Sequence, residues 1–167
     1  MTTEYLLNRE IGHILAALTP QNALIMEVVL QTGLRISDVL ELRTEQLRTS
    51  MWVREKKTGK MHRCGIPKPL LEQVFEQAGP VWAFPGSKPG QHKTRQAVWK
   101  DIKRAEAVFK RSGALSRRQN LGTHTARKYA AVGAYHRGGM AAAQRLLNHS
   151  DPLITRLYAL ADMEVSG

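Results

Sequence analysis

Apolar residues recur at helical spacing along most of the chain. Between residues 8 and 18 they lie three and four positions apart, which predicts an amphipathic helix. A broader apolar stretch over 20–32 predicts a central core helix, and Gly33 suits a left-handed C-cap that ends it. The same reasoning predicts further helices over residues 38–42, 67–78, 94–112, 123–137, 140–148 and 152–161.

Capping residues and glycines predict where several of these helices begin and end. Thr19–Pro20 is expected to cap and start the central helix, and Ser37 is expected to be the N-cap of the next one. Gly138–Gly139 should break the helix that starts near His124. Asp151 and Pro152 should start the last helix.

A strand pattern appears only after the third predicted helix. Residues 51–53 and 61–66 read as two strands, and residues 57–60 lie near the turn between them. The prediction is therefore a mainly α fold with one small antiparallel β-hairpin. The 167 residues contain no repeat and no convincing linker, so we expect a single domain over 1–167.

The charge of the chain indicates a polyanionic partner. Lys and Arg number 25 against 14 acidic residues, which gives a net charge of +11 and favours a nucleic acid as the partner. Cys64 is the only cysteine, so no intramolecular disulfide can form. We see no signal peptide and no run of roughly eighteen apolar residues, and we therefore expect a cytoplasmic protein without a membrane partner.

Six residues form a set that suits chemistry at a phosphate group. They comprise two guanidiniums, one lysine, two imidazoles and one phenol: Arg35, Lys57, His124, Arg127, His149 and Tyr158. Each alone has a simpler interpretation as a helix cap, a core residue or a solvated charge. His62 and Cys64 flank one residue of a predicted strand, but no second ligand pair at zinc spacing exists, so we expect no metal site.

The order and spacing of these residues resemble the catalytic signature of the tyrosine recombinases, also called phage-type integrases. The motifs are TGLRISDVLEL over 32–42, KTGK over 57–60, HTAR over 124–127, and His149 followed nine residues later by Tyr158. The resemblance spans about residues 5–161 and implies the tyrosine recombinase catalytic-domain fold. It also implies a site-specific recombinase that cleaves and rejoins DNA strands.

The resemblance implies a role for each residue of the signature. Tyr158 would attack a DNA phosphodiester, giving a 3′-phosphotyrosyl link and a free 5′-hydroxyl. Arg35 and Arg127 would stabilise the developing phosphate charge, for which the planar guanidinium fork is well suited. Because the covalent link retains the bond energy, we expect that neither a metal nor ATP is required.

The other three residues would handle protons and phosphate oxygens. Lys57 resembles the general acid that protonates the leaving 5′-oxygen; the alternative is that this basic hairpin, in which Lys56 and Lys60 flank Lys57, only contacts phosphates. His124 would act on the tyrosine proton or support the phosphate. His149 would donate a hydrogen bond to a non-bridging oxygen.

Basic residues outside this signature are candidates for holding double-stranded DNA by its backbone. They are Arg43, Lys56, Lys60, His62, Arg63, Lys88, His92, Lys93, Arg95, Lys100, Lys103, Arg117 and Arg118. We expect a monomer in solution that assembles on DNA, as a tetramer in the synapse, with accessory DNA-bending proteins.

The sequence departs from the family pattern in three ways. The predicted first helix begins close to Met1, so we expect the N-terminal core-binding domain of most relatives to be absent, either because the recombinase consists of the catalytic domain alone or because the chain is a fragment. Asn148 stands where relatives commonly have glycine, and asparagine tolerates a left-handed backbone better than most residues. Only nine residues follow Tyr158, which puts exchange of a C-terminal helix between subunits in doubt.

Other functions stay open on the sequence alone. A type IB topoisomerase-like enzyme would relax supercoils through the same intermediate. A non-catalytic or regulatory DNA-binding protein could keep the fold, and the helix, turn and helix over 24–42 superficially resemble a helix-turn-helix regulator.

Overall fold

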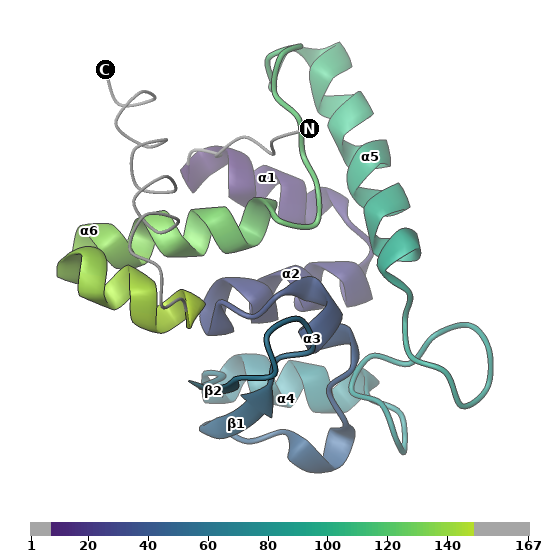
Figure 1. Ribbon diagram of the computed structural model, residues 1–167. Helices are drawn as coiled ribbons and strands as arrows, with labels where there is room; N and C mark the ends of the chain where they lie inside the picture. The colour runs from purple at the N-terminus through teal and green to yellow at the C-terminus, as the bar shows by residue number, and fades with distance from the viewer. Residues whose placement is uncertain (1–7, 149–167) are drawn as a thin grey trace.

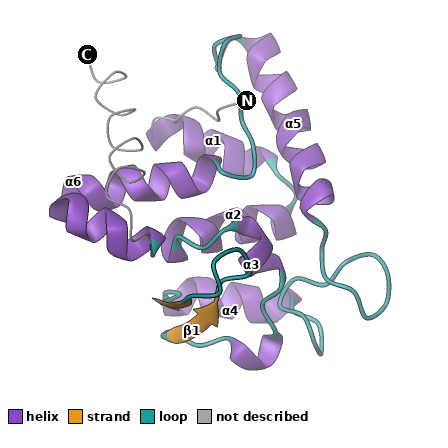
Figure 2. Cartoon of the chain, in the orientation of Figure 1, coloured by secondary structure: helices purple, strands orange, loops and turns teal. Residues whose placement is uncertain are grey.

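The computed structural model describes residues 8–148 of the chain (Figure 1). Over this range the elements are α1 (Asn8–Ala17), α2 (Pro20–Thr32), α3 (Ile36–Leu40), the 3-10 helix η1 (Thr44–Gln46), β1 (Met51–Arg54), β2 (Met61–Cys64), α4 (Lys68–Gln77), α5 (Arg95–Ser112) and α6 (Thr125–Leu147). The predicted mainly helical fold with a small antiparallel hairpin is confirmed (Figure 2). The helix expected over 152–161 lies outside the described residues.

Helix α2 is the centre of the core, as its broad apolar face predicts. It packs against α1, α3, α4 and α6, and its Ile25, Val28 and Val29 are fully buried. Figure 1 shows α1 and α6 on one side of α2, with α4 and the hairpin on the other. None of the helices within 8–148 is long and apolar enough to cross a bilayer.

The start of α2 is stabilised from a distant helix. Pro20 is the first helical residue as predicted, but the Thr19 side chain makes no capping hydrogen bond. Instead, Asp101 Oδ2 of α5 accepts the Thr19 N–H at 2.9 Å and Asn22 Nδ2 at 2.8 Å. Burial alone would raise the pKa of Asp101, but these donors and Arg104 outweigh it and lower the pKa to about 2. A charged Asp101 therefore joins α5 to α2.

The expected N-cap at Ser37 is wrong. The N–H groups of Asp38 and Val39 both donate to the carbonyl of Arg35, so α3 begins at Ile36 and Arg35 is the N-cap. The reason is the core. Ile36, Val39 and Leu40 are all buried, and they share one face of a helix only if the helix already includes Ile36.

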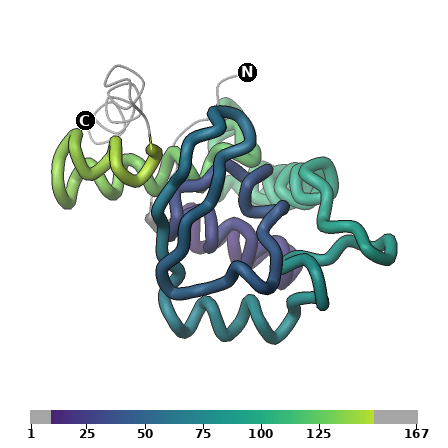
Figure 3. The backbone as a smooth tube through the Cα atoms, turned by 60° about the horizontal axis from the view of Figure 1, so that its bottom comes forward, coloured from purple at the N-terminus to yellow at the C-terminus, as the bar shows by residue number. Residues whose placement is uncertain are grey.

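The hairpin alternates between an inner and an outer face. β1 and β2 run side by side as an antiparallel hairpin (Figure 3). Met51 pairs with Cys64 and Val53 pairs with His62. These four side chains are buried, whereas the outward side chains between them are exposed. β2 ends at Cys64, two residues before the predicted end of the strand.

Helix α6 is broken where predicted. Gly138 and Gly139 have non-helical dihedral angles, with φ of 73° at Gly139, so α6 consists of two segments that meet at a kink. The second segment ends at Asn148, which adopts φ 54° and ψ 34°. The prediction that asparagine would accept the left-handed conformation here is confirmed.

Candidate active site

The site is built around the corner at Gly33, where α2 ends. Gly33 has φ of 69°, a conformation that favours glycine, and its N–H donates to Val29 O at 2.9 Å. A Cβ at this position would also collide with the carbonyl oxygen and the side chain of Leu146. The corner is therefore packed directly against the second segment of α6.

Arg127 links three helix ends at this corner. Its Nε donates to Gly33 O at 2.8 Å, and its Nη2 donates to Leu147 O at 3.0 Å. The residue is only 4% exposed. Arg127 therefore connects the start of α6 to the end of α2 and to the end of α6 itself. This places it beside the segment that carries Arg35.

Arg35 lies at the start of α3 with a mostly buried side chain. Its Nη1 forms an ion pair with Glu55 Oε2 at 3.1 Å, and 13% of the side chain is exposed. A guanidinium has five N–H donors, so one used for Glu55 leaves others for a phosphate.

Glu55 is a site residue that the sequence analysis missed. Its side chain is 1% exposed; Thr58 Oγ1 donates to Oε2 at 3.0 Å, and His62 Nδ1 lies 3.2 Å from Oε1. Burial alone would raise the pKa of Glu55, but Thr58, Arg35 and His62 outweigh it and hold the pKa below its ordinary value. In the sequence Glu55 lies among basic residues, which favours the interpretation of an exposed carboxylate. The alternation of buried side chains at Met51 and Val53, continued by two residues, would have predicted that Glu55 points inward.

Lys57 lies on the turn of the hairpin and is exposed. The turn is closed by two backbone hydrogen bonds of 2.8 Å, from Gly59 N to Glu55 O and from Glu55 N to Lys60 O. Asp38 Oδ1 accepts the N–H of Lys56 at 2.8 Å and ties the same turn to α3. The Lys57 side chain has no hydrogen-bonding partner within residues 8–148. The turn that carries it is therefore held in place, while its ammonium group stays available to a ligand.

His124 is the N-cap residue of α6 and lies among cations. Its Nε2 is 3.4 Å from Arg95 Nη2 at the start of α5. Burial lowers the pKa of His124, and the charges of Arg95, Arg127, Lys128 and Arg35 lower it further. A neutral imidazole at neutral pH can accept a proton.

The structure brings Arg35 together with His124 and Arg127, which lie about ninety positions later in the sequence, next to the hairpin that carries Lys57. His149 and Tyr158 lie outside the described residues. Asn148, directly before His149, donates through Nδ2 to Met61 O at 3.2 Å and to Glu55 Oε1 at 3.4 Å. The end of α6 thus lies against the hairpin at Asn148.

The candidate DNA contacts differ in their surroundings. His62 is 2% exposed and burial lowers its pKa, so its selection as a DNA contact is wrong; the inward face of β2 was not recognised. Lys56 is exposed and pairs with Glu41 at 2.7 Å, and Arg43 lies over the ring of Trp82. Lys103 is partly buried between Glu106 and Asn120. The following candidates are wholly or partly exposed and stay predictions: Arg43, Lys56, Lys60, Arg63, Lys93, Arg95, Lys100, Arg117 and Arg118.

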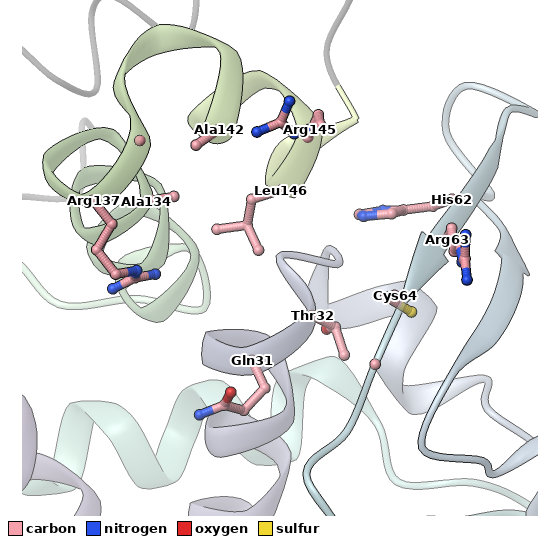
Figure 4. A pocket seen from close by; sticks show the side chains of 12 residues that line it. Gln31, Thr32, His62, Arg63, Cys64, Ala134, Arg137, Ala142, Arg145 and Leu146 are labelled. Atoms are coloured by element: carbon pink, nitrogen blue, oxygen red, sulfur yellow. The ribbon is translucent and has the colours of Figure 1, made fainter.

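A pocket of about 420 Å³ lies beside the Gly33 corner, between β2, the end of α2 and both segments of α6 (Figure 4). Arg63, Arg137 and Arg145 line it, so the pocket is cationic. His62 and Cys64 also face it, and burial raises the pKa of the Cys64 thiol to about 11. The thiol is therefore protonated at neutral pH. Residues 8–148 contain no group of three or more His, Cys, Asp or Glu side chains that could hold a metal ion.

Two arginines and a histidine thus lie together on a helical scaffold beside a lysine-bearing hairpin. The sequence pattern of the phage integrase family matches residues 4–164, and the chain belongs to this family. It is 29% identical over 143 residues to the probable integrase/recombinase YoeC of Bacillus subtilis (strain 168), an alignment that covers 82% of this chain and 76% of YoeC. The predicted membership of the tyrosine recombinases is confirmed.

Solved structures show the same fold at low sequence identity. A λ integrase dimer bound to a COC′ core site superposes with a TM-score of 0.75 at 20% identity, covering 95% of this chain and 48% of that one. The XerH site-specific recombinase bound to palindromic difH substrate gives 0.73 at 20% identity, covering 92% and 48%. This chain thus spans about half the length of these recombinases, and the fold class predicted from the sequence is confirmed.

Proposed function

We propose that this protein cleaves and rejoins double-stranded DNA at a specific site through a covalent bond to Tyr158. The observation that carries the proposal is the convergence of Arg35, His124 and Arg127 at the Gly33 corner. A phosphodiester gains negative charge as a nucleophile adds to it, and preorganised guanidiniums stabilise that charge in a largely desolvated site. Such donors typically contribute about 2.7–4 kcal/mol each.

The remaining roles follow from the family signature. Tyr158 forms the 3′-phosphotyrosyl bond while the 5′-oxygen leaves with a proton from Lys57. His124, neutral at neutral pH, takes the tyrosine proton or supports the phosphate, and His149 donates a hydrogen bond to a non-bridging oxygen. Attack by the 5′-hydroxyl of another strand reverses the reaction and seals the exchanged DNA, so the cycle requires no ATP.

Partners and location follow from this reaction. The basic residues on the surface hold the DNA backbone, and exchange between two duplexes requires four subunits assembled on the DNA. The λ integrase and XerH structures, both in complex with DNA, support DNA as the partner. The activity belongs where the cellular or phage DNA lies, in the cytoplasm.

The test is a cleavage assay with suicide substrates. Nicked duplexes that cover sites near the protein's own gene are mixed with the protein and resolved on a denaturing gel. We expect a slow-migrating protein–DNA band in the wild type and none in Tyr158→Phe, which lacks only the nucleophilic hydroxyl and should still bind DNA. A band that persists in Tyr158→Phe would refute the assignment of the nucleophile. Binding at the correct site without any band would favour a regulatory protein.

A further inference from the structure

The buried carboxylate of Glu55 joins parts of the site that are far apart in the sequence. Arg35 at the start of α3 and Thr58 in the hairpin turn both donate to Oε2. On the other oxygen, Asn148 Nδ2 donates at 3.4 Å and His62 Nδ1 lies 3.2 Å away. Groups from α3, the hairpin turn, β2 and the end of α6 therefore meet at one side chain.

An anionic acceptor suits this position because each of the four side chains that contact Glu55 is a donor or a potential donor. A carboxylate offers two oxygens and no proton, and it can accept several hydrogen bonds at once. The burial of Glu55 makes an uncompensated charge costly, so its partners must remain in place. Arg35, Thr58 and Asn148 are therefore held with respect to one another.

We propose that Glu55 is a positioning residue, which orients the Arg35 guanidinium and keeps the Lys57 turn and the segment entering His149 aligned with it. The inference rests on the proposed DNA cleavage. Glu55 touches no reacting atom: it acts through Arg35, whose other donors stay available to a phosphate, and through Thr58, which is the residue after Lys57.

Asn148 extends this device to the C-terminal side of the site. Its backbone supplies the left-handed end of α6, and its side chain bonds both Glu55 and the Met61 carbonyl. A glycine would keep the backbone conformation but lose both bonds. Asn148→Gly therefore separates the side-chain link from the turn geometry.

The experiment compares Glu55→Gln and Asn148→Gly with a control, Glu72→Gln, which removes an exposed carboxylate of α4. Glutamine keeps the volume of Glu55, but its amide nitrogen faces donors. Hydrogen exchange of the DNA-free proteins comes first, because it is independent of activity. We expect exchange of the amides over residues 55–61 to rise about 10-fold in Glu55→Gln and less in Asn148→Gly, and to stay unchanged in the control.

Single-turnover cleavage of a saturating nicked duplex, chosen by the wild-type covalent band, is the second measurement. We expect the cleavage rate of Glu55→Gln to fall about 100-fold, the scale of a small misplacement of catalytic groups, while its Kd for the duplex changes less than about threefold. The cleavage rate of Asn148→Gly should fall less than that of Glu55→Gln, and its Kd for the duplex should again change little.

The outcomes separate this proposal from the function beneath it. A wild-type rate in Glu55→Gln, or a loss of affinity equal to the loss of rate, would overturn the positioning role. If the wild-type protein forms no covalent band, the proposed function fails, and unchanged exchange over 55–61 would overturn the role of Glu55 separately. If Glu55→Gln does not fold, Asn148→Gly decides both measurements.

Discussion

The two sides of the candidate site hold their cations in different ways. On the hairpin side, Arg35 pairs with Glu55 and Lys56 pairs with Glu41, so carboxylates balance the charge. On the α5–α6 side, His124 lies among cations, and the neighbouring Arg127 bonds carbonyl oxygens.

This difference suggests a division of labour. A cation paired with a carboxylate is fixed in orientation but attracts an anion weakly over a distance, whereas several cations close together raise the local potential. The hairpin side would therefore set geometry, and the α5–α6 side would attract the phosphate. Three predictions test the comparison.

The largest effect is expected for the stability role of Arg127. Arg127→Met removes the donors to Gly33 O and Leu147 O and leaves two carbonyls without them in a buried corner. Each such loss costs roughly 1–3 kcal/mol, so the two together should lower the free energy of unfolding by about 2–6 kcal/mol in a urea titration.

Lys57→Met is the matched control, since Lys57 is also a predicted catalytic cation but is exposed and unpaired within 8–148. Its unfolding free energy should change by no more than about 0.5 kcal/mol. Equal losses in the two variants would show that the corner does not depend on Arg127.

A smaller effect is expected at Asp101, which fixes α5, and with it Arg95, to the core. Because the folded pKa of Asp101 is about 2 against an ordinary 3.8, the charged form contributes about 2 kcal/mol of stability at neutral pH. That stability is fully present above the ordinary pKa and is mostly lost as the pH falls to about 2.

Asp101→Asn should therefore be less stable than the wild type at pH 7, and the difference should shrink between pH 4 and pH 2. Urea titrations across this range measure it, with Glu76→Gln on the exposed face of α4 as control. If the difference in unfolding free energy between the two proteins does not change with pH, the charge of Asp101 does not contribute to stability.

Local patterns predicted those features whose cause is local. Gly33 as a C-cap, the break at Gly138–Gly139 and the hairpin all follow from residues within a few positions of one another, and the motif order led to Arg35, His124 and Arg127. His149 and Tyr158 stay predictions, since both lie outside the described residues.

Long-range partners explain what the sequence could not reveal. Asp101 and Glu106 lie on the buried face of α5, where periodicity alone expects apolar residues. Asp101 is satisfied by Thr19 and Asn22, about eighty positions away, and Glu106 accepts the N–H of Leu121. Glu55 and Asn148 are likewise 93 positions apart. Propensity carries no information about such pairs.

The smallest expected effect concerns the charge around His124. Arg95→Gln removes the cation whose Nη2 lies 3.4 Å from His124 Nε2. The pKa of His124 should rise but stay below its ordinary value, because burial, the first cause of the shift, is unchanged. Titration of the imidazole Cε1–H resonance by NMR measures the change.

Lys100→Gln, on the same helix but not among the charges that act on His124, is the control and should leave this pKa unchanged. If Arg95→Gln also leaves it unchanged, the α5–α6 side is not the positive half of the site. A rise would show that the charge of Arg95 acts on His124, and a negative phosphate placed near the imidazole would raise its pKa in the same direction. The imidazole would then become more basic as the substrate arrives.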